Sequence, residues 1–145
     1  MVDVIEFDPI KYEFGQGGLF PPEYENEQNI LFHGTSEQNA ASILANSFER
    51  TGMYDFTSFA QKSIESLPYA CNKRIHRGRG AILSVRFKDL SSTALRKVNE
   101  IYYLEKYDPE HQPTFLAICY IPHDYDFRKK TIKNQILINQ YRNIS

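Results

Sequence analysis

The sequence predicts an α+β fold, and two observations lead to this prediction. Short apolar stretches typical of strands alternate with amphipathic stretches typical of helices. None of the strands is followed by the glycine-rich phosphate-binding turn of a doubly wound dinucleotide fold. The expected strands lie at residues 30–33, 81–87, 114–121 and 132–138, with a brief one at 2–7. The central strand is expected at 114–121, because this stretch is almost wholly apolar and suits burial on both faces.

At 145 residues, the chain is expected to form one domain spanning residues 1–145. Glycines and prolines interrupt residues 1–28, which we expect to be an irregular N-terminal segment. No stretch has the length and apolar character of a membrane span, and no secretory signal is legible. We therefore expect an intracellular protein, cytoplasmic or nuclear, with no membrane partner.

Composition narrows the functional classes. The net charge of −1 gives no overall field that would attract nucleic acid. Cys71 and Cys119 form neither a metal-binding spacing nor a disulfide framework, so no metal is expected and a reducing compartment is the default. The chain has 10 Tyr and 10 Phe but no Trp, which favours β structure and offers stacking surfaces.

The corner at His33 and Gly34 is the first candidate site. The strand at residues 30–33 delivers these residues to the start of a helix expected over 37–48, which Thr35 or Ser36 would cap. The positive end of that helix would point back at the corner and suit a phosphate or a polarised carbonyl. The alternative is that His33 merely ends a strand.

Further elements follow along the chain. Residues 51–56 suggest a turn into a brief strand, and Thr57 or Ser58 is expected to cap a second helix, which should kink or restart at Pro68. Residues 73–80 form a basic loop, which is either a solvated surface or a contact for phosphates. A third helix is expected over residues 93–106.

Taken in order, these segments resemble the ADP-ribosyltransferase fold, in its poly(ADP-ribose)-polymerase-like and diphtheria-toxin-like branch. The resemblance covers about residues 29–140. It is carried by Leu31-Phe32-His33-Gly34-Thr35, Gly52-Met53-Tyr54, the helix leading to Tyr69-Ala70, Gly80-Ala81-Ile82-Leu83, and Asn134-Gln135-Ile136-Leu137-Ile138. It implies split antiparallel or mixed sheets flanked by short helices, and NAD+ as the co-substrate.

The resemblance also implies roles for individual residues. The nicotinamide carboxamide would bind the main chain of Gly34 and meet Ser66, and a ribose hydroxyl would bind His33, with Thr35 close by. Tyr69 would stack on one face of the nicotinamide ring and Tyr54 would lie against the other. The catalytic set implied is His33, Tyr54 and the residue on the last strand, which is Gln135 where the family usually has glutamate.

Gln135 keeps the hydrogen bond to the ribose but supplies no negative charge. By analogy with the loss of one preorganised electrostatic contact, this costs about 3–4 kcal/mol, or roughly 10²–10³ in rate. Three explanations stay open: a mono-transferase that needs no glutamate, a binding-only pseudoenzyme, and an engineered Glu-to-Gln change.

The sequence thus predicts an NAD+-dependent mono-ADP-ribosyltransferase that releases nicotinamide and modifies a macromolecular acceptor, protein rather than nucleic acid. The alternative is a catalytically inactive module of the same fold that binds a ligand or a protein. A nucleic-acid-binding domain using residues 73–79 is a third class, which the near-neutral charge disfavours.

Overall fold

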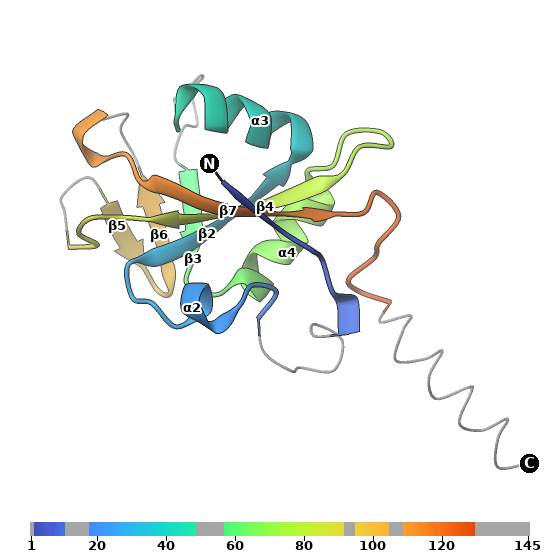
Figure 1. The fold of residues 1–145 in the computed structure, drawn as a ribbon, viewed down its shortest axis with the longest axis horizontal. Helices are drawn as coiled ribbons and strands as arrows, with labels where there is room; N and C mark the ends of the chain where they lie inside the picture. Colours follow the sequence, from blue (N-terminus) through green and yellow to red (C-terminus); the bar gives the residue numbers. More distant parts are fainter. Residues whose placement is uncertain (1, 11–17, 49–56, 92–94, 105–108, 130–145) are drawn as a thin grey trace, which may run out of the picture.

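A mixed β-sheet with helices on both of its faces forms the body of the protein in the computed structural model (Figure 1). The structure describes residues 2–10, 18–48, 57–91, 95–104 and 109–129. Within these residues the strands are β1 (Asp3–Ile5), β2 (Ile30–Ser36), β3 (Thr57–Ala60), β4 (Gly80–Arg86), β5 (Leu95–Val98), β6 (Ile101–Leu104) and β7 (Thr114–Ile121). Their order across the sheet is β1-β7-β4-β2-β3-β6-β5. Only β1 and β7 pair in parallel in this part of the chain, and the α+β class is confirmed.

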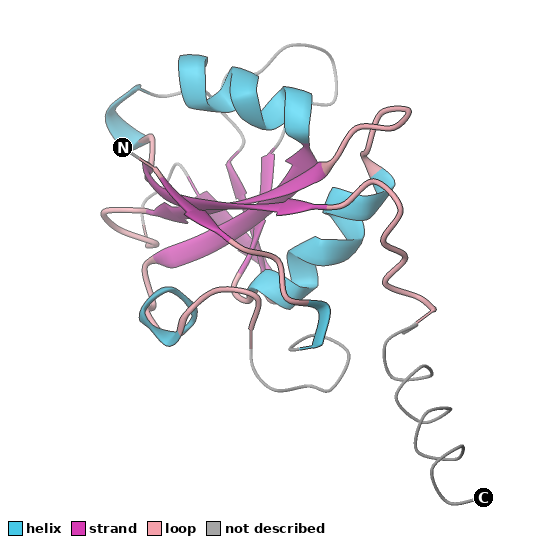
Figure 2. Cartoon of the chain, turned by 45° about the vertical axis from the view of Figure 1, so that its right-hand side comes forward, coloured by secondary structure: helices cyan, strands magenta, loops and turns pink. Residues whose placement is uncertain are grey.

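Helices cover the two faces of the sheet separately (Figures 1 and 2). The helix α3 (Glu37–Asn46) buries Ala40 and Ile43 on one face, and α4 (Ser63–Asn72) buries Leu67 and Ala70 on the other. The short helix α2 (Pro22–Glu25) and the 3-10 turn η1 (Pro109–His111) complete the described helices. Successive strand side chains point to opposite faces, so a sheet covered on both sides needs strands that are apolar throughout.

The expected strands at residues 81–87 and 114–121 are confirmed as β4 and β7. Leu83 and Val85 pack on the α3 side, whereas Ile82 packs on the α4 side. The strand expected at 30–33 is also present but continues to Ser36. The hydroxyl of Ser36 accepts a hydrogen bond from the backbone N–H of Asn39 at 3.0 Å, which confirms Ser36 as the cap of α3.

Two residues of the N-terminal segment pack into the core. Leu19 and Phe20 are buried on the α4 side of the sheet, where α2 follows directly. The backbone N–H of Leu19 donates to the hydroxyl of Ser63 at 2.8 Å, and that hydroxyl also contacts the Glu25 carboxylate. These contacts tie the segment to the first turn of α4.

The prediction of a helix over residues 93–106 is wrong for the residues of this range that the structure describes. Residues 95–104 form the antiparallel pair of β5 and β6 instead. Asn99 takes φ 56° at the turn, a left-handed conformation that Asn tolerates better than most residues. Arg96 lies over the ring of Tyr103 at 5.7 Å and Lys97 over Tyr102 at 5.5 Å, so cross-strand pairs stabilise the hairpin.

The start of the second helix is also corrected. Thr57 and Ser58 do not cap a helix, because residues 57–60 are paired with β6 as β3. The helix begins at Ser63 and runs on through Pro68 to Asn72 without a restart. The brief strand expected at 51–56 and the last strand expected at 132–138 lie outside the described residues.

In the described part of the chain, no helix is both long enough and apolar enough to cross a bilayer.

Gly34 lets α4 lie directly on β2, and its replacement by alanine should be costly. A Cβ atom at Gly34 would lie 2.2 Å from the backbone oxygen of Ser66, so strand and helix would have to separate. We expect Gly34→Ala to lower the free energy of unfolding by about 2 kcal/mol or more in urea denaturation, as overpacking costs about 1–3 kcal/mol. Unchanged stability would contradict this packing.

Candidate functional site

The site forms where β2 and β3 part. Their ladder has one backbone pair, Phe32 with Ala60, within the described residues. The next pair in an antiparallel ladder would join Gly34 to Ser58. Instead, the Nδ1 atom of His33 lies 2.8 Å from the carbonyl oxygen of Ser58. The His33 side chain therefore binds the Ser58 carbonyl, which would otherwise accept a hydrogen bond from the backbone of Gly34.

The environment of His33 fixes its chemical form. Only 6% of the residue is exposed, and its ring lies against Phe48 at 5.3 Å and Phe59 at 5.6 Å between centroids. Burial lowers the pKa of His33 to about 4, and the hydrogen bond to Ser58, which raises the pKa, offsets only part of this effect. The imidazole is therefore neutral at pH 7. Because the Ser58 carbonyl can only accept, Nδ1 carries the proton and Nε2 is left as an acceptor.

The parting strands leave a cavity of about 250 Å³ between β2, β3 and α4. Its walls combine backbone, aromatic and hydroxyl groups with one carboxylate. The lining residues are Gly34, Ser58, Phe59, Ala60, Glu65, Ser66, Tyr69 and Ile101. Three residues predicted from the sequence to bind the co-substrate thus meet in this cavity: Gly34, Ser66 and Tyr69.

Gly34 contributes main-chain groups to the site. Two hydrogen bonds flank the β2–β4 ladder: the N–H of Phe87 donates to the carbonyl of Asn29, and the N–H of Glu37 donates to the carbonyl of Arg79. Asn29 and Glu37 are odd-numbered, so within this register the odd-numbered residues of β2 hydrogen-bond to β4. Peptide groups alternate in direction along a strand, so the N–H and C=O of Gly34 face the other edge, toward β3. The missing Cβ atom serves a separate purpose, which is the close approach of α4.

Ser66 and Tyr69 reach the cavity from the same face of α4. The Ser66 hydroxyl donates to the carbonyl of Phe32 at 3.1 Å and is buried. Tyr69 is 46% exposed, so it is a surface aromatic rather than a core residue. The ammonium of Lys73 lies 5.8 Å from the centre of the Tyr69 ring. The exposed face of an aromatic ring is suited to a cationic ligand.

Other predicted residues fall elsewhere. His33 itself does not line the cavity but holds its wall through Ser58. Thr35 is buried on the α3 side and accepts a hydrogen bond from the Asn39 side chain at 2.8 Å. Tyr54 and Gln135 lie outside the described residues.

The start of α3 does not line the cavity either. Glu37 in its first turn forms a two-pronged hydrogen-bonded ion pair with Arg79, at 2.8 and 2.9 Å. The first turn is thus capped by Ser36 and covered by an ion pair. Arg79 of the basic loop is engaged there and also lies 3.9 Å from the centre of the Tyr120 ring.

Comparison of the chain with protein-family models, with curated proteins and with solved structures found no match.

Sequence reasoning missed Ser58, Phe59 and Glu65. The first two had been placed in a helix, so their backbone contacts with β2 and β6 could not be foreseen. Glu65 could have been found, because it lies four residues before Tyr69 and residues at that spacing share a helix face.

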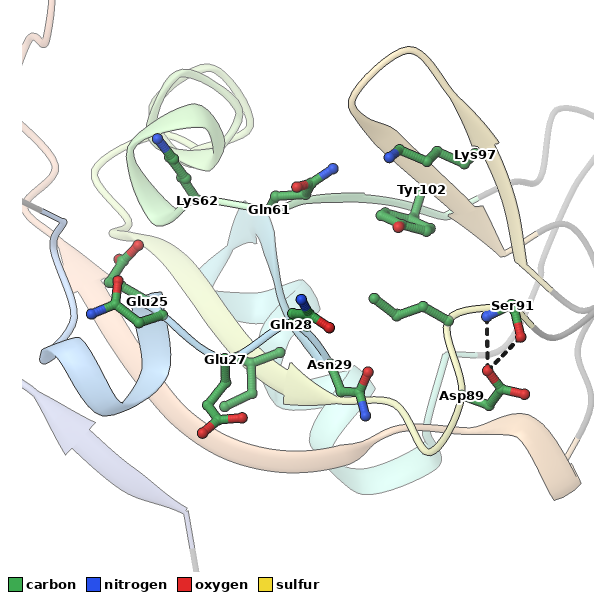
Figure 3. Close-up of a pocket in the computed structure, with 13 residues that line it drawn as sticks. Glu25, Glu27, Gln28, Asn29, Gln61, Lys62, Asp89, Ser91, Lys97 and Tyr102 are labelled. Carbon is green, nitrogen blue, oxygen red and sulfur yellow. Dashed lines mark hydrogen bonds between the residues drawn. The ribbon is translucent and has the colours of Figure 1, made fainter.

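A second and larger opening, of about 690 Å³, lies beside the ends of β3 and β6 (Figure 3). Gln28, Gln61 and Tyr102 point toward it from three separate segments. Its charged lining residues are of both signs: Glu25, Glu27, Asp89, Lys62 and Lys97. Asp89 is held by the N–H and hydroxyl of Ser91. The opening is therefore polar, with no strong field of one sign.

The described residues contain no group of three or more His, Cys, Asp or Glu side chains that could hold a metal ion. Cys71 and Cys119 are both free and buried, and burial raises the pKa of the Cys119 thiol to about 12.

Burial of neutral His33 should make the fold sensitive to mild acid. The folded-state pKa of about 4 lies below the ordinary value of 6.5, so the unfolded chain binds more protons between these values. Stability is then complete above pH 6.5 and is lost as the pH falls toward 4. The loss attributable to His33 reaches roughly 3 kcal/mol at about 1.4 kcal/mol per pH unit.

Urea denaturation of the wild type and His33→Asn across this pH range measures the effect. The variant keeps a donor for Ser58 but has no titrating ring, so its stability should vary less between pH 6.5 and 4. The lowered carboxyl pKa values of Glu37, Asp89 and Asp126 add acid sensitivity that both proteins share. Equal pH slopes would show that His33 is not buried in its neutral form.

Proposed function

We propose that the cavity binds the nicotinamide ring of NAD+ and that the protein is a mono-ADP-ribosyltransferase of the poly(ADP-ribose)-polymerase-like branch. The observation that carries this proposal is the position of Gly34. Its backbone N–H and C=O face a cavity that also contains an exposed aromatic ring. A primary carboxamide offers one donor and one acceptor edge, which complements these two groups.

The size of the cavity agrees with one ring rather than a whole dinucleotide. Typical ligand pockets measure about 300–1,000 Å³, and this one holds about 250 Å³. Tyr69 supplies an exposed aromatic face, and Ala60 and Ile101 supply apolar contact for a flat ring. Ser66 donates its proton to Phe32, which leaves its oxygen as an acceptor for a carboxamide N–H.

NAD+ supplies a ribose carbon attached to a cationic leaving group, and the family transfers that ribose to an acceptor nucleophile. The resemblance assigns His33 to the ribose end of such a site. Its neutral ring keeps Nε2 as a hydrogen-bond acceptor, and the ring adjoins the cavity wall through Ser58. Its tautomer is set in advance by Ser58, so no proton has to move before Nε2 accepts a hydroxyl.

The acceptor is proposed to be a protein. The opening of about 690 Å³ is separated from the nicotinamide cavity by only the corner between β3 and α4. Gln61 and Lys62 line the larger opening, and Ala60 and Glu65 line the nicotinamide cavity. Its amides and mixed charges suit a polypeptide. Nucleic acid would call for a basic surface of the kind that releases counterions, and the lining charges do not form one.

A catalytically inactive binding module is the second candidate, and Gln135 favours it. An amide at the third family position cannot stabilise positive charge as a carboxylate does, and mono-transfer would then proceed slowly or not at all.

Binding is tested by thermal unfolding with NAD+. Saturation at about 100 times Kd stabilises a protein by about 2.7 kcal/mol, which corresponds to a rise of several degrees in Tm. We expect such a rise in the wild type and its loss in His33→Ala and in Tyr69→Ala. Ser91→Ala, which alters the larger opening, should keep it. The absence of any shift in the wild type would refute the proposed ligand.

Catalysis is tested by incubating the wild type and Gln135→Glu with labelled NAD+. If the protein is a weakened transferase, the variant should label itself or an added acceptor about 10²–10³ times faster. Absence of labelling in both, together with a thermal shift, would establish the binding module instead.

A further inference from the structure

Among the described residues that line the nicotinamide cavity, Glu65 is the charged one. It lies in the first turn of α4, four residues before Tyr69, so both side chains project from the same face of the helix. Glu65 is solvent-exposed. The contacts of Ser63 already fix the first turn of α4, so the Glu65 carboxylate is not required to stabilise the helix.

The other described residues of the cavity wall carry no charge. Ser58 and Ser66 offer hydroxyls and backbone groups, and Ile101 and Ala60 are apolar. A carboxylate beside an aromatic face in an otherwise neutral wall favours a flat ligand that carries a positive charge.

The nearest competing charge is Lys73, one further helical turn along. Its ammonium lies 5.8 Å from the centre of the Tyr69 ring, and surrounding protein atoms lower its pKa. Glu65, Tyr69 and Lys73 therefore follow one another at intervals of four residues, with the negative group at the cavity and the positive group beyond the ring. A cation is attracted at the first position and repelled at the last.

From this arrangement we infer that Glu65 makes the cavity selective for the charge of the ring, so that it binds a cationic nicotinamide in preference to a neutral one. This inference rests on the proposed assignment of the cavity to the nicotinamide ring. Glu65 acts here as a specificity-determining residue, and it is independent of Gln135.

Charge selection would serve both ends of the proposed reaction. NAD+ carries the positive ring, whereas its reduced form carries a neutral one, so the oxidised form is preferred. When the bond between ribose and ring nitrogen breaks, both electrons stay with the nitrogen and the ring becomes neutral. The positive charge passes to the ribose, and the acceptor nucleophile then bonds to that carbon and loses its proton. Released nicotinamide is no longer attracted by Glu65, which favours its departure.

The inference is tested with two probes that share the ring and the carboxamide, 1-methylnicotinamide, which is permanently cationic, and neutral nicotinamide. Their Kd values are measured by calorimetry, and NMR shifts at Gly34 and Tyr69 verify that they bind in the cavity. We expect the wild type to bind the cation about threefold to tenfold more tightly, in line with a half-solvated charge contact and a cation–aromatic contact. Glu65→Gln should lower this ratio about threefold to fivefold.

Glu23→Gln is the matched control, because it removes the same charge from an exposed position on α2 that lines neither cavity. It should leave the ratio unchanged. Lys73→Met should raise this ratio of affinities, because it removes a positive charge. It therefore tests the inference in the opposite direction if Glu65→Gln does not fold. In the wild type the preference should also shrink at about 1 M salt, where the Debye length falls to about 3 Å.

An unchanged ratio in folded Glu65→Gln, or an equal affinity of the wild type for both probes, would overturn the inference and leave the nicotinamide cavity intact. Failure of both probes to shift Gly34 and Tyr69 would overturn the inference and the proposed function together.

Discussion

The hydrogen bond from His33 Nδ1 to the carbonyl of Ser58 is the contact on which the site depends. An antiparallel ladder gains a pair of backbone bonds with every second residue, so two strands that begin to pair tend to continue. Here the imidazole takes the next carbonyl and the ladder stops after Phe32 and Ala60. The strands part at that point, and the main chain of Gly34 is left facing the cavity.

The parted strands need support from both sides of the sheet. On the α3 side, the rings of Phe48 and Phe59 enclose His33, which is held neutral by burial. On the α4 side, the helix closes directly over Gly34 because no Cβ atom intervenes. The N-terminal segment then fixes the first turn of α4 through Leu19. The cavity is thus shaped by packing on both faces of the sheet.

Local patterns in the sequence were sufficient for the elements whose burial is uniform. β4 and β7 are apolar on both faces, so their apolar stretches identified them as strands. α3 begins at a serine cap, so the capping residue and the helical spacing of its apolar residues identified it. The misassigned segments are those that tertiary contacts decide. Residues 57–60 carry a helix-start signal but pair with β6, and residues 95–104 fit a helical period but form a hairpin around Asn99. The residues of the site were partly foreseeable: Gly34 came from the corner between strand and helix, whereas Ser66 and Tyr69 came from the resemblance to the ADP-ribosyltransferase fold. Ser58 and Phe59 depended on strand register, which no local pattern reports.

The central claim is that the Gly34 amide faces a ligand cavity rather than a strand partner, and hydrogen exchange at single residues tests it most directly. The amides of His33 and Thr35, which belong to the ladder with β4, should be strongly protected in the free protein, and the amide of Gly34 much less so. Addition of NAD+ should slow exchange at Gly34 by at least about tenfold, because the carboxamide then occupies it, while His33 and Thr35 change little. Equal protection of all three amides without ligand, and no change on adding NAD+, would contradict the account.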